Sequence, residues 1–142
     1  MSVQAGNIMS AKKTSPGKRK DVSLDQLYFD PENPRLPGGK RTDDEQRVLQ
    51  WMLQNGDLPE LMASIASTGY SDAEPLLVTP GLGGFIVVEG NRRLAALKLL
   101  HAPELAPLRK KTIAEVAANA KHKDITNIPV ICYEKRQDIL DY

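Results

Sequence analysis

The fold of this chain is decided by one stretch, Phe85-Ile86-Val87-Val88-Glu89-Gly90-Asn91-Arg92-Arg93-Leu94-Ala95-Ala96-Leu97-Lys98-Leu99. Its first four residues are β-branched or aromatic, which predicts a buried strand. Its second half is rich in alanine and leucine, which predicts a helix. Gly90 therefore marks a turn that leads from the strand directly into the helix.

Two adjacent arginines, Arg92 and Arg93, stand where this helix begins. A helix N-terminus carries unsatisfied N–H groups and about half a positive charge, so arginines there are unfavourable unless an anion lies opposite. Phosphate is the usual anion at such a terminus, held by backbone N–H groups and arginine forks. The alternative is a structural ion pair, in which Glu89 or the acidic cluster Asp43-Asp44-Glu45 neutralises the arginines.

The composition predicts one globular domain, because 142 residues with 41% apolar and 26% charged side chains can build a proper core. No apolar stretch has transmembrane or signal-peptide character, so we expect a cytoplasmic protein without a membrane partner. The single cysteine, Cys132, excludes an internal disulfide and a cysteine-rich zinc site. His101 and His122 lack metal-ligand spacing, so no metal site is predicted for them.

A basic segment occupies the start of the chain. Residues 1–20 combine Ser, Gly, Pro and Lys with no acidic residue, which predicts a disordered leader. Such an arm either contacts DNA or acts as a solubilising tail, and composition does not separate the two. Its DNA-binding candidates are Lys12, Lys13, Lys18, Arg19 and Lys20.

Helices and strands alternate along the remaining chain. We expect a helix from a Thr42 cap to Asn55, with Trp51 in the core, and a second helix that Asp57 and Glu60 start as a capping box. A strand over residues 75–79 and the strand over 85–89 form a hairpin through the glycine-rich residues 80–84.

The sequence outside this centre is less regular. A short strand or turn is expected over residues 22–27, and a loop is expected over residues 30–39. A helical turn is expected around 104–111, and a further helix to residue 120 follows a capping box of Thr112 and Glu115. A strand over 128–133 has Pro129 at its start or on a sheet edge. Residues 135–142 predict the start of another helix, which leads to a C-terminal part or partner.

Several of these segments resemble, in order and spacing, the N-terminal domain of the ParB/sulfiredoxin superfamily. The resemblance rests on the helix before Gly69, on Glu74-Pro75-Leu76-Leu77-Val78, on Val88-Glu89-Gly90-Asn91-Arg92-Arg93-Leu94-Ala95-Ala96 and on Ile128-Pro129-Val130. It implies a small α/β (α+β) domain over residues 21–134, with a mixed sheet packed by helices. It also implies a bound nucleoside triphosphate with magnesium.

The resemblance assigns roles to individual residues. Gly90, Asn91, Arg92 and Arg93 would bind the phosphates, and Arg35 is an accessory phosphate candidate. Gly69, Glu74 and Pro75 would lie near the base. Ala95 or Ala96 would let the helix pack close to the sheet.

Two departures from the family bear on chemistry. Partition-type ParB proteins usually have a glutamate where this chain has Asn91, and Glu89 is the residue that could replace it as a magnesium-linked carboxylate or catalytic base. Sulfiredoxins have a cysteine at the same position, so their thiol chemistry has no nucleophile here. The string Glu-Gly-Asn-Arg-Arg is also similar to turns in bacterial or phage DNA-modification and phage-defence proteins.

Three functions follow as hypotheses. The first is a nucleotide-dependent switch in a DNA-associated protein. The second is an enzyme, an NTPase or a DNA nuclease, that uses Glu89. The third is a module that binds the DNA backbone through Arg92 and Arg93. The nucleotide, the oligomeric state and the pathway stay open.

Overall fold

A computed structural model describes residues 16–33, 45–121 and 125–141 of the chain. The expected Thr42 cap, the loop around Arg35 and His122 lie outside these residues. The elements run in the order β2 (Lys18–Ser23), η1 (Leu24–Gln26), β3 (Leu27–Phe29), α2 (Glu45–Asn55), α3 (Leu58–Thr68), β4 (Leu76–Gly81), β5 (Gly84–Glu89), α4 (Asn91–His101), η3 (Pro103–Leu105), α5 (Lys110–Ala118), β6 (Asn127–Cys132) and α6 (Arg136–Leu140).

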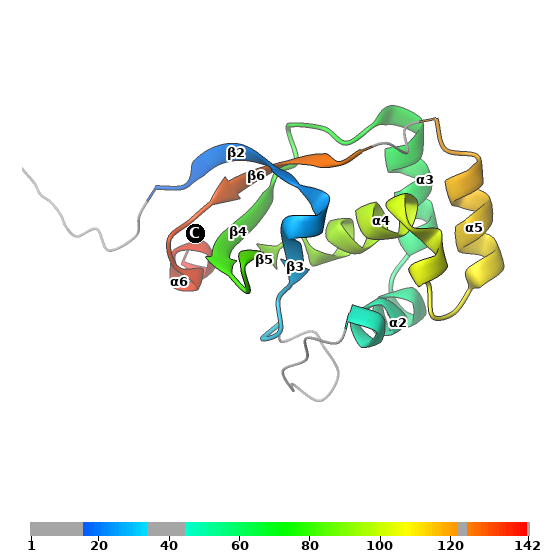
Figure 1. Cartoon of the computed structure of the whole chain (residues 1–142), viewed down its shortest axis with the longest axis horizontal. Coiled ribbons are helices and arrows are strands. Elements are labelled where there is room, and N and C mark those ends of the chain that lie inside the picture. The colour runs from blue at the N-terminus through cyan, green and yellow to red at the C-terminus, as the bar shows by residue number, and fades with distance from the viewer. Residues whose placement is uncertain (1–15, 34–44, 122–124, 142) are drawn as a thin grey trace, which may run out of the picture.

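The strands form one five-stranded mixed sheet in the order β2-β6-β4-β5-β3. Strands β2 and β6, and β4 and β5, pair antiparallel, whereas β4 with β6 and β3 with β5 pair parallel. Figure 1 shows the sheet on one side of the molecule and the longer helices on the other. This arrangement confirms the predicted α/β fold with a mixed sheet packed by helices.

The hairpin of β4 and β5 is confirmed as an antiparallel pair. Its tip contains Leu82 and Gly83, both with positive φ, at 57° and 80°. A two-residue turn with left-handed residues matches the twist of the flanking strands, which accounts for the glycines at this place in the sequence.

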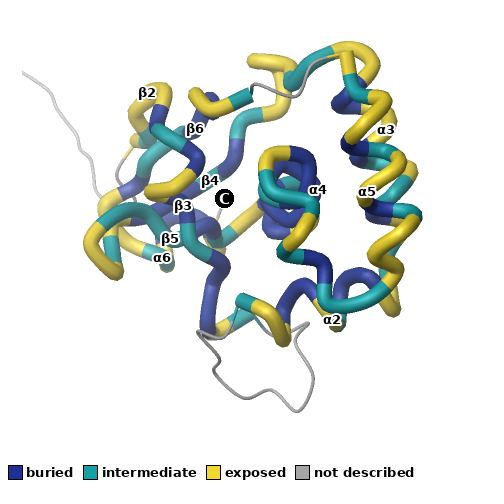
Figure 2. The backbone as a smooth tube through the Cα atoms, turned by 45° about the vertical axis from the view of Figure 1, so that its right-hand side comes forward, coloured by how far each residue is buried: buried dark blue, intermediate teal, exposed yellow. Residues whose placement is uncertain are grey.

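Helix α4 lies at the centre of the molecule, with the sheet on one side and helices α3 and α5 on the other (Figures 1 and 2). Most of its residues are buried, and Leu94, Ala95, Ala96 and Leu99 are completely inaccessible to solvent. Between Leu94 and Leu100 only Lys98 is not buried, as expected for a helix segment with neighbours on several sides. Both alanines are therefore where close packing was predicted.

Strand β2 corrects the boundary of the basic leader. Lys18, Arg19 and Lys20 were expected in the disordered segment 1–20, but they form the first half of β2 and pair with β6. Pro129 was expected at a strand start or an edge. It is the third residue of β6, which lies between β2 and β4, and its Cα partner is Asp21.

The helix starts also differ in detail from the prediction. Asp57 stands at the N-cap of α3 but makes no side-chain capping hydrogen bond, and Pro59 occupies the first turn. The capping box of Thr112 and Glu115 is wrong as well, because α5 begins earlier, after Arg109 in a left-handed conformation. Proline in the first turn already has a helical φ and has no N–H group that would need an acceptor, which favours the start of α3 without the capping box.

Helix α6 follows β6 and packs against β4 and β5. Asp138 and Ile139 are buried, and Leu140 is 56% exposed. The predicted helix in residues 135–142 is thus present, while the expected continuation into a C-terminal part stays a prediction.

Candidate functional site

A cleft of about 830 Å³ lies where β3 and β5 end and α4 begins. Its wall brings together parts of the sequence that are far apart, from the residue after β3 to α6. The lining residues are Asp30, Asn33, Trp51, Met52, Asn55, Gly56, Asp57, Leu61, Glu74, Val88, Glu89, Gly90, Asn91, Arg92, Arg93, Arg136 and Leu140.

Gly90 shapes the turn at the bottom of the cleft. Its φ of 109° is left-handed, and a Cβ built on it would lie 2.5 Å from Cδ2 of Leu76 and 3.3 Å from Nη2 of Arg93. Only glycine fits this position without strain. Gly90 is the N-cap residue of α4 and has no side chain that could cap the helix, and the first turn of α4 holds no acidic residue. The N-terminal N–H groups of α4 are therefore open to an anion in the cleft.

Asn91 uses its side chain for structure. The side chain is buried, its Nδ2 donates to the Val87 carbonyl at 2.8 Å, and its Oδ1 accepts from the Asp30 N–H at 3.2 Å. The amide thus joins the end of β3 to the end of β5. The resemblance predicted a phosphate-binding role for Asn91, and this geometry leaves that role to its backbone N–H.

A bulge places Glu89 in the cleft. Leu77 pairs with Glu89 and Val78 pairs with Val87, so Val88 is an extra residue in β5. A bulge re-aims the side chains that follow it, which explains how the consecutive residues Val88 and Glu89 both line the cleft. Within the described residues Glu89 makes no ion pair, so the structural pairing with Arg92 or Arg93 is absent there.

Arg93 is held by the loop before β4. Its Nη1 donates to the Glu74 carbonyl at 3.0 Å and lies 3.5 Å from the Tyr70 hydroxyl, which itself donates to the same carbonyl. Burial raises the pKa of Tyr70, and the Glu74 charge raises it further while Arg93 lowers it. The phenol therefore stays protonated at neutral pH and keeps its donor role in this network.

Arg92 lies near the end of α2, whereas Arg93 contacts the loop before β4. Arg92 is exposed, and its Nε lies 3.5 Å from the position that a Cβ on Gly56 would occupy. Gly56 follows the last residue of α2, so the absence of a side chain there gives the guanidinium room beside the end of that helix. The two adjacent arginines thus reach different walls of one cleft.

Arg136 and Asp30 are site residues that the sequence analysis missed. Asp30 is only 2% exposed and forms an ion pair with Nη1 of Arg136, whose Nη2 donates to the Glu32 carbonyl at 3.3 Å. The two partners are 106 residues apart, and no local pattern joins them. The available signal was weak: an acidic residue after one strand and a basic residue after another.

Trp51 was expected in the core; it is partly buried against the edge of the core and also lines the cleft. The buried face of α2 consists of Val48, Leu49, Met52 and Leu53, and Trp51 lies at its edge. Asn55 follows one helical turn later, lines the same cleft, and donates from Nδ2 to the Trp51 carbonyl at 2.9 Å. The indole is half-buried.

The three residues predicted near the base are placed differently from one another. Glu74 lines the cleft, and its carbonyl holds Arg93. Gly69 ends α3 with φ of 82°, and Pro75 precedes β4, and neither lines the cleft.

The basic residues at the start of the chain lie away from the cleft. Nη2 of Arg19 donates to the Asp72 carbonyl at 2.8 Å, and Nζ of Lys20 lies 5.3 Å from the centre of the Phe85 ring. Lys18 is exposed at the start of β2. Lys12, Lys13 and Arg35 lie outside the described residues, so their predicted roles have no structural account.

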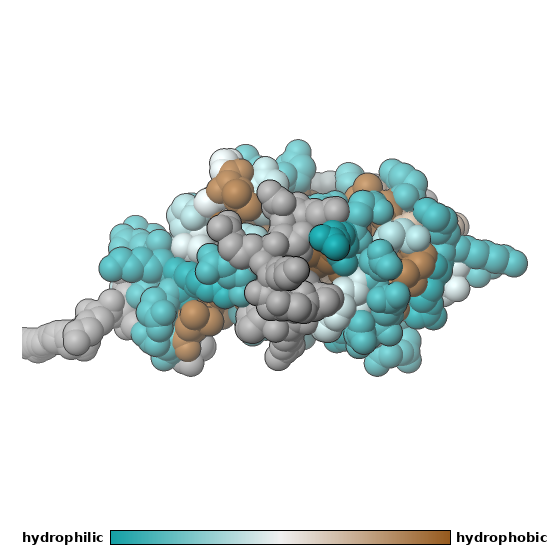
Figure 3. Space-filling model, turned by 90° about the horizontal axis from the view of Figure 1, so that it is seen from below, coloured by the Kyte–Doolittle hydropathy of each residue, from teal (hydrophilic) through white to brown (hydrophobic). Residues whose placement is uncertain are grey.

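The surface gives few other indications of a partner. The face in Figure 3 is largely hydrophilic, and its apolar patches are small and separate. In the described ranges, no cluster of three or more His, Cys, Asp or Glu residues has the arrangement of a metal site. No helix in that part of the chain has the length and apolar character needed to cross a membrane.

Three comparisons relate the chain to known proteins. No protein-family model and no curated protein matches the chain. Among solved structures, the chain is similar to the C-terminally truncated chromosome-partitioning protein ParB from Caulobacter crescentus, in complex with CTP-gamma-S, with 22% identity and a TM-score of 0.47.

The match covers 88% of this chain and 49% of that one, so the chain spans about half the length of the structure that it matches. That structure is of a ParB protein, and the sequence analysis found a resemblance to the ParB/sulfiredoxin superfamily. The likeness concerns the fold, and CTP-gamma-S is the ligand of that ParB protein.

Proposed function

We propose that the cleft binds a nucleoside triphosphate with Mg²⁺ and that the chain acts as a nucleotide-dependent switch in a DNA-associated protein. One observation carries the proposal: Arg92, Arg93 and Arg136 converge on one cleft together with the uncapped N-terminus of α4. Guanidinium forks and helix N–H groups are the usual ligands of phosphate chains, and several of them on different walls suit an extended polyphosphate.

The charge of the cleft favours a magnesium complex over a bare triphosphate. The lining holds three arginines against four carboxylates, those of Asp30, Asp57, Glu74 and Glu89. A bare triphosphate would meet this formal excess of negative charge. Mg²⁺ is usually bound by phosphate oxygens, water and one or two carboxylates, so it would offset the repulsion without a dedicated protein cage. Glu89 is the carboxylate that we assign to the metal.

The ion pair of Arg136 with Asp30 supports the switch. Arg136 belongs to α6, and its partner lies beside the turn at Gly90. A bound phosphate would compete with Asp30 for the same guanidinium. A ligand shifts a conformational equilibrium only through different contacts in the two states, and this exchange of anions is such a difference. The position of α6, and of whatever follows it, would then report nucleotide binding.

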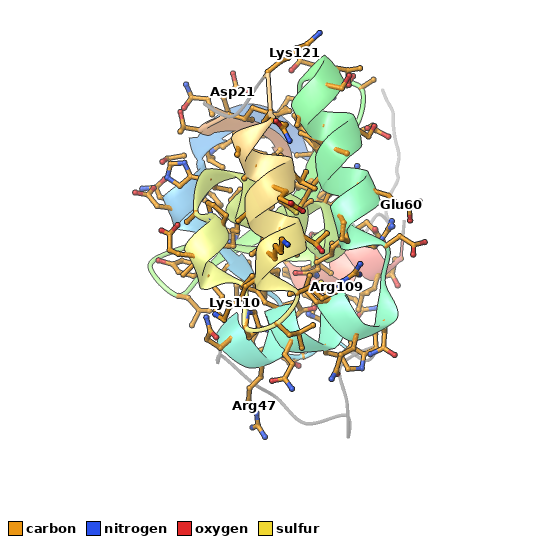
Figure 4. The ribbon with its side chains drawn as sticks, turned by 90° about the vertical axis from the view of Figure 1, so that its right-hand side faces the viewer. Asp21, Arg47, Glu60, Arg109, Lys110 and Lys121 are labelled. Carbon is orange, nitrogen blue, oxygen red and sulfur yellow. The ribbon has the colours of Figure 1, made fainter. Side chains whose placement is uncertain are left out.

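Calorimetric titration with ATP, CTP and GTP, each with and without Mg²⁺, tests the proposal. We expect Arg93→Ala to weaken binding roughly 10- to 150-fold, because a charge-assisted hydrogen bond contributes about 1.5–3 kcal/mol. Arg47→Ala is the matched control, since Arg47 is exposed on α2 and points away from the molecule in Figure 4. The proposal fails if no nucleotide binds the wild type, or if both variants bind alike.

A second function, hydrolysis of the nucleotide or of DNA, is favoured by the position of Glu89. This carboxylate lines the cleft, is exposed, and has no ion pair with a described residue. A carboxylate in that state can hold magnesium or accept a proton from an attacking water.

DNA binding is the remaining proposal. Lys18, Arg19 and Lys20 are exposed on β2, an outer strand of the sheet, next to the basic segment that precedes it. Exposed lysine and arginine side chains at the edge of a sheet can bind phosphate groups of DNA without sequence preference.

A further inference from the structure

We infer that Trp51 stacks on the base of the nucleotide, so that the cleft takes a nucleobase together with the phosphates. This inference rests on the proposed function and adds the part of the ligand that Trp51 recognises. The chain contains one tryptophan, and that residue lies at the wall of the cleft.

The local sequence explains why this side chain is accessible. The buried side chains of α2 are Val48, Leu49, Met52 and Leu53, which form one continuous face. Trp51 stands at the edge of that face, where its ring is half-buried against the core and half-open to the cleft. A tryptophan that served the core alone would be expected within the buried face, because the hydrophobic effect favours complete burial of such a large ring.

The surroundings of Trp51 suit a flat aromatic ligand. Met52 and Leu61 add apolar surface to the same cleft. The Asn55 side chain lines the same cleft and donates to the Trp51 carbonyl at 2.9 Å, which ties it to the last turn of α2. Base stacking on an aromatic ring works for every base, because each base has a π-face.

The size and the arginines of the cleft place the phosphates next to this wall. Arg92 lies beside Gly56, which follows α2 directly, so a phosphate on Arg92 is adjacent to the end of the helix that carries Trp51. The volume of about 830 Å³ is at the upper end of the usual range for small-molecule sites and exceeds what a phosphate chain needs. A base is the part of a nucleotide that would occupy the apolar remainder.

The single tryptophan makes a direct test. We expect ATP, CTP and GTP with Mg²⁺ to quench the tryptophan fluorescence, and inorganic tripolyphosphate with Mg²⁺ to leave it almost unchanged. By calorimetry, Trp51→Ala should weaken nucleotide binding roughly 5- to 150-fold, the range found when a stacking aromatic is removed. The same variant should bind tripolyphosphate as the wild type does.

Two further variants exclude loss of folding as the cause. Trp51→Phe keeps an aromatic face and should retain most of the nucleotide affinity. Tyr28→Ala removes a half-buried aromatic of β3 that does not line the cleft, and should leave nucleotide affinity unchanged. Circular dichroism and thermal unfolding check each variant.

The outcomes separate this inference from the proposed function. If the wild type and Trp51→Ala have the same affinity for nucleotides, and also the same affinity for tripolyphosphate, the base does not stack on Trp51. The proposed phosphate site is then unaffected. If neither ligand binds the wild type, both the inference and the proposed function are wrong.

Discussion

Replacement of Arg136 by methionine should destabilise the chain by about 3 kcal/mol, the lower end of the range for removing one partner of a buried ion pair. Asp30 is 2% exposed and would lose the guanidinium that pairs with its carboxylate, while the Arg136 side chain is 26% exposed, which reduces the loss. Methionine retains much of the apolar volume of the arginine stem. At 142 residues, a loss of this size corresponds to a fall in Tm of roughly 6–12 °C.

Urea unfolding followed by circular dichroism measures this change. Lys135→Met is the matched control, because Lys135 is exposed and its position lies just before α6, and we expect a change within about 0.5 kcal/mol. The double variant Asp30→Asn with Arg136→Met removes both charges and should recover a large part of the stability, since no unpaired buried charge remains. A loss below about 1 kcal/mol for Arg136→Met, or a double variant that shows the plain sum of the single losses, would refute the reasoning.

Three other changes test separate parts of the structure. Gly90→Ala should lower stability by about 1–3 kcal/mol and weaken nucleotide binding, because φ of 109° is strained for alanine and its Cβ would meet Leu76. Unchanged unfolding would contradict the left-handed turn. Gly83→Ala is the control that separates backbone strain from side-chain contact, because Gly83 has φ of 80° but a Cβ there would have no atom within 4 Å. Deletion of residues 1–15 should leave Tm unchanged, whereas deletion of residues 1–20 should lower Tm, because Lys18–Ser23 forms β2. Equal Tm values for the two truncations would show that the first half of β2 contributes nothing to stability. Glu89→Gln should preserve nucleotide binding but reduce any hydrolysis roughly 10²- to 10⁴-fold, measured by phosphate release, if Glu89 is a general base; wild-type turnover in this variant would exclude that role.

The regular parts of the fold could be predicted because local chemistry determines them. The β-branched run before Gly90, the alanine-rich run after it and the glycines at residues 80–84 each indicate one structure, and the hairpin and α4 agree. The starts of α3 and α5 could not be predicted from capping patterns. Pro59 begins one helix without a side-chain cap, and Arg109 begins the other from a left-handed conformation.

In the candidate site, too, only the residues with a local sequence signal could be predicted. The turn with Arg92 and Arg93 was visible in the sequence, because cations at a helix start are locally unfavourable and call for an anion. Arg136 and Trp51 were not visible, because nothing in their own neighbourhoods is unfavourable. Arg136 follows β6 and reaches Asp30 only because β6 pairs in parallel with β4 at the centre of the sheet. Residues brought to a site by sheet topology carry no local signal.

The contrasting behaviour of the two side chains flanking Arg92 follows from the same physics. Asn91 is an amide with one donor group and one acceptor, and the bulged end of β5 and the residue after β3 offer a carbonyl and an N–H at hydrogen-bond distance. Burial of that amide is favourable only because both of its groups are paired. Arg93 also has a carbonyl partner, but a guanidinium has five donors, so the Glu74 carbonyl and the Tyr70 hydroxyl leave it with donors for a ligand. The structure thus uses Asn91 to hold the turn in place and keeps the arginines for the cleft.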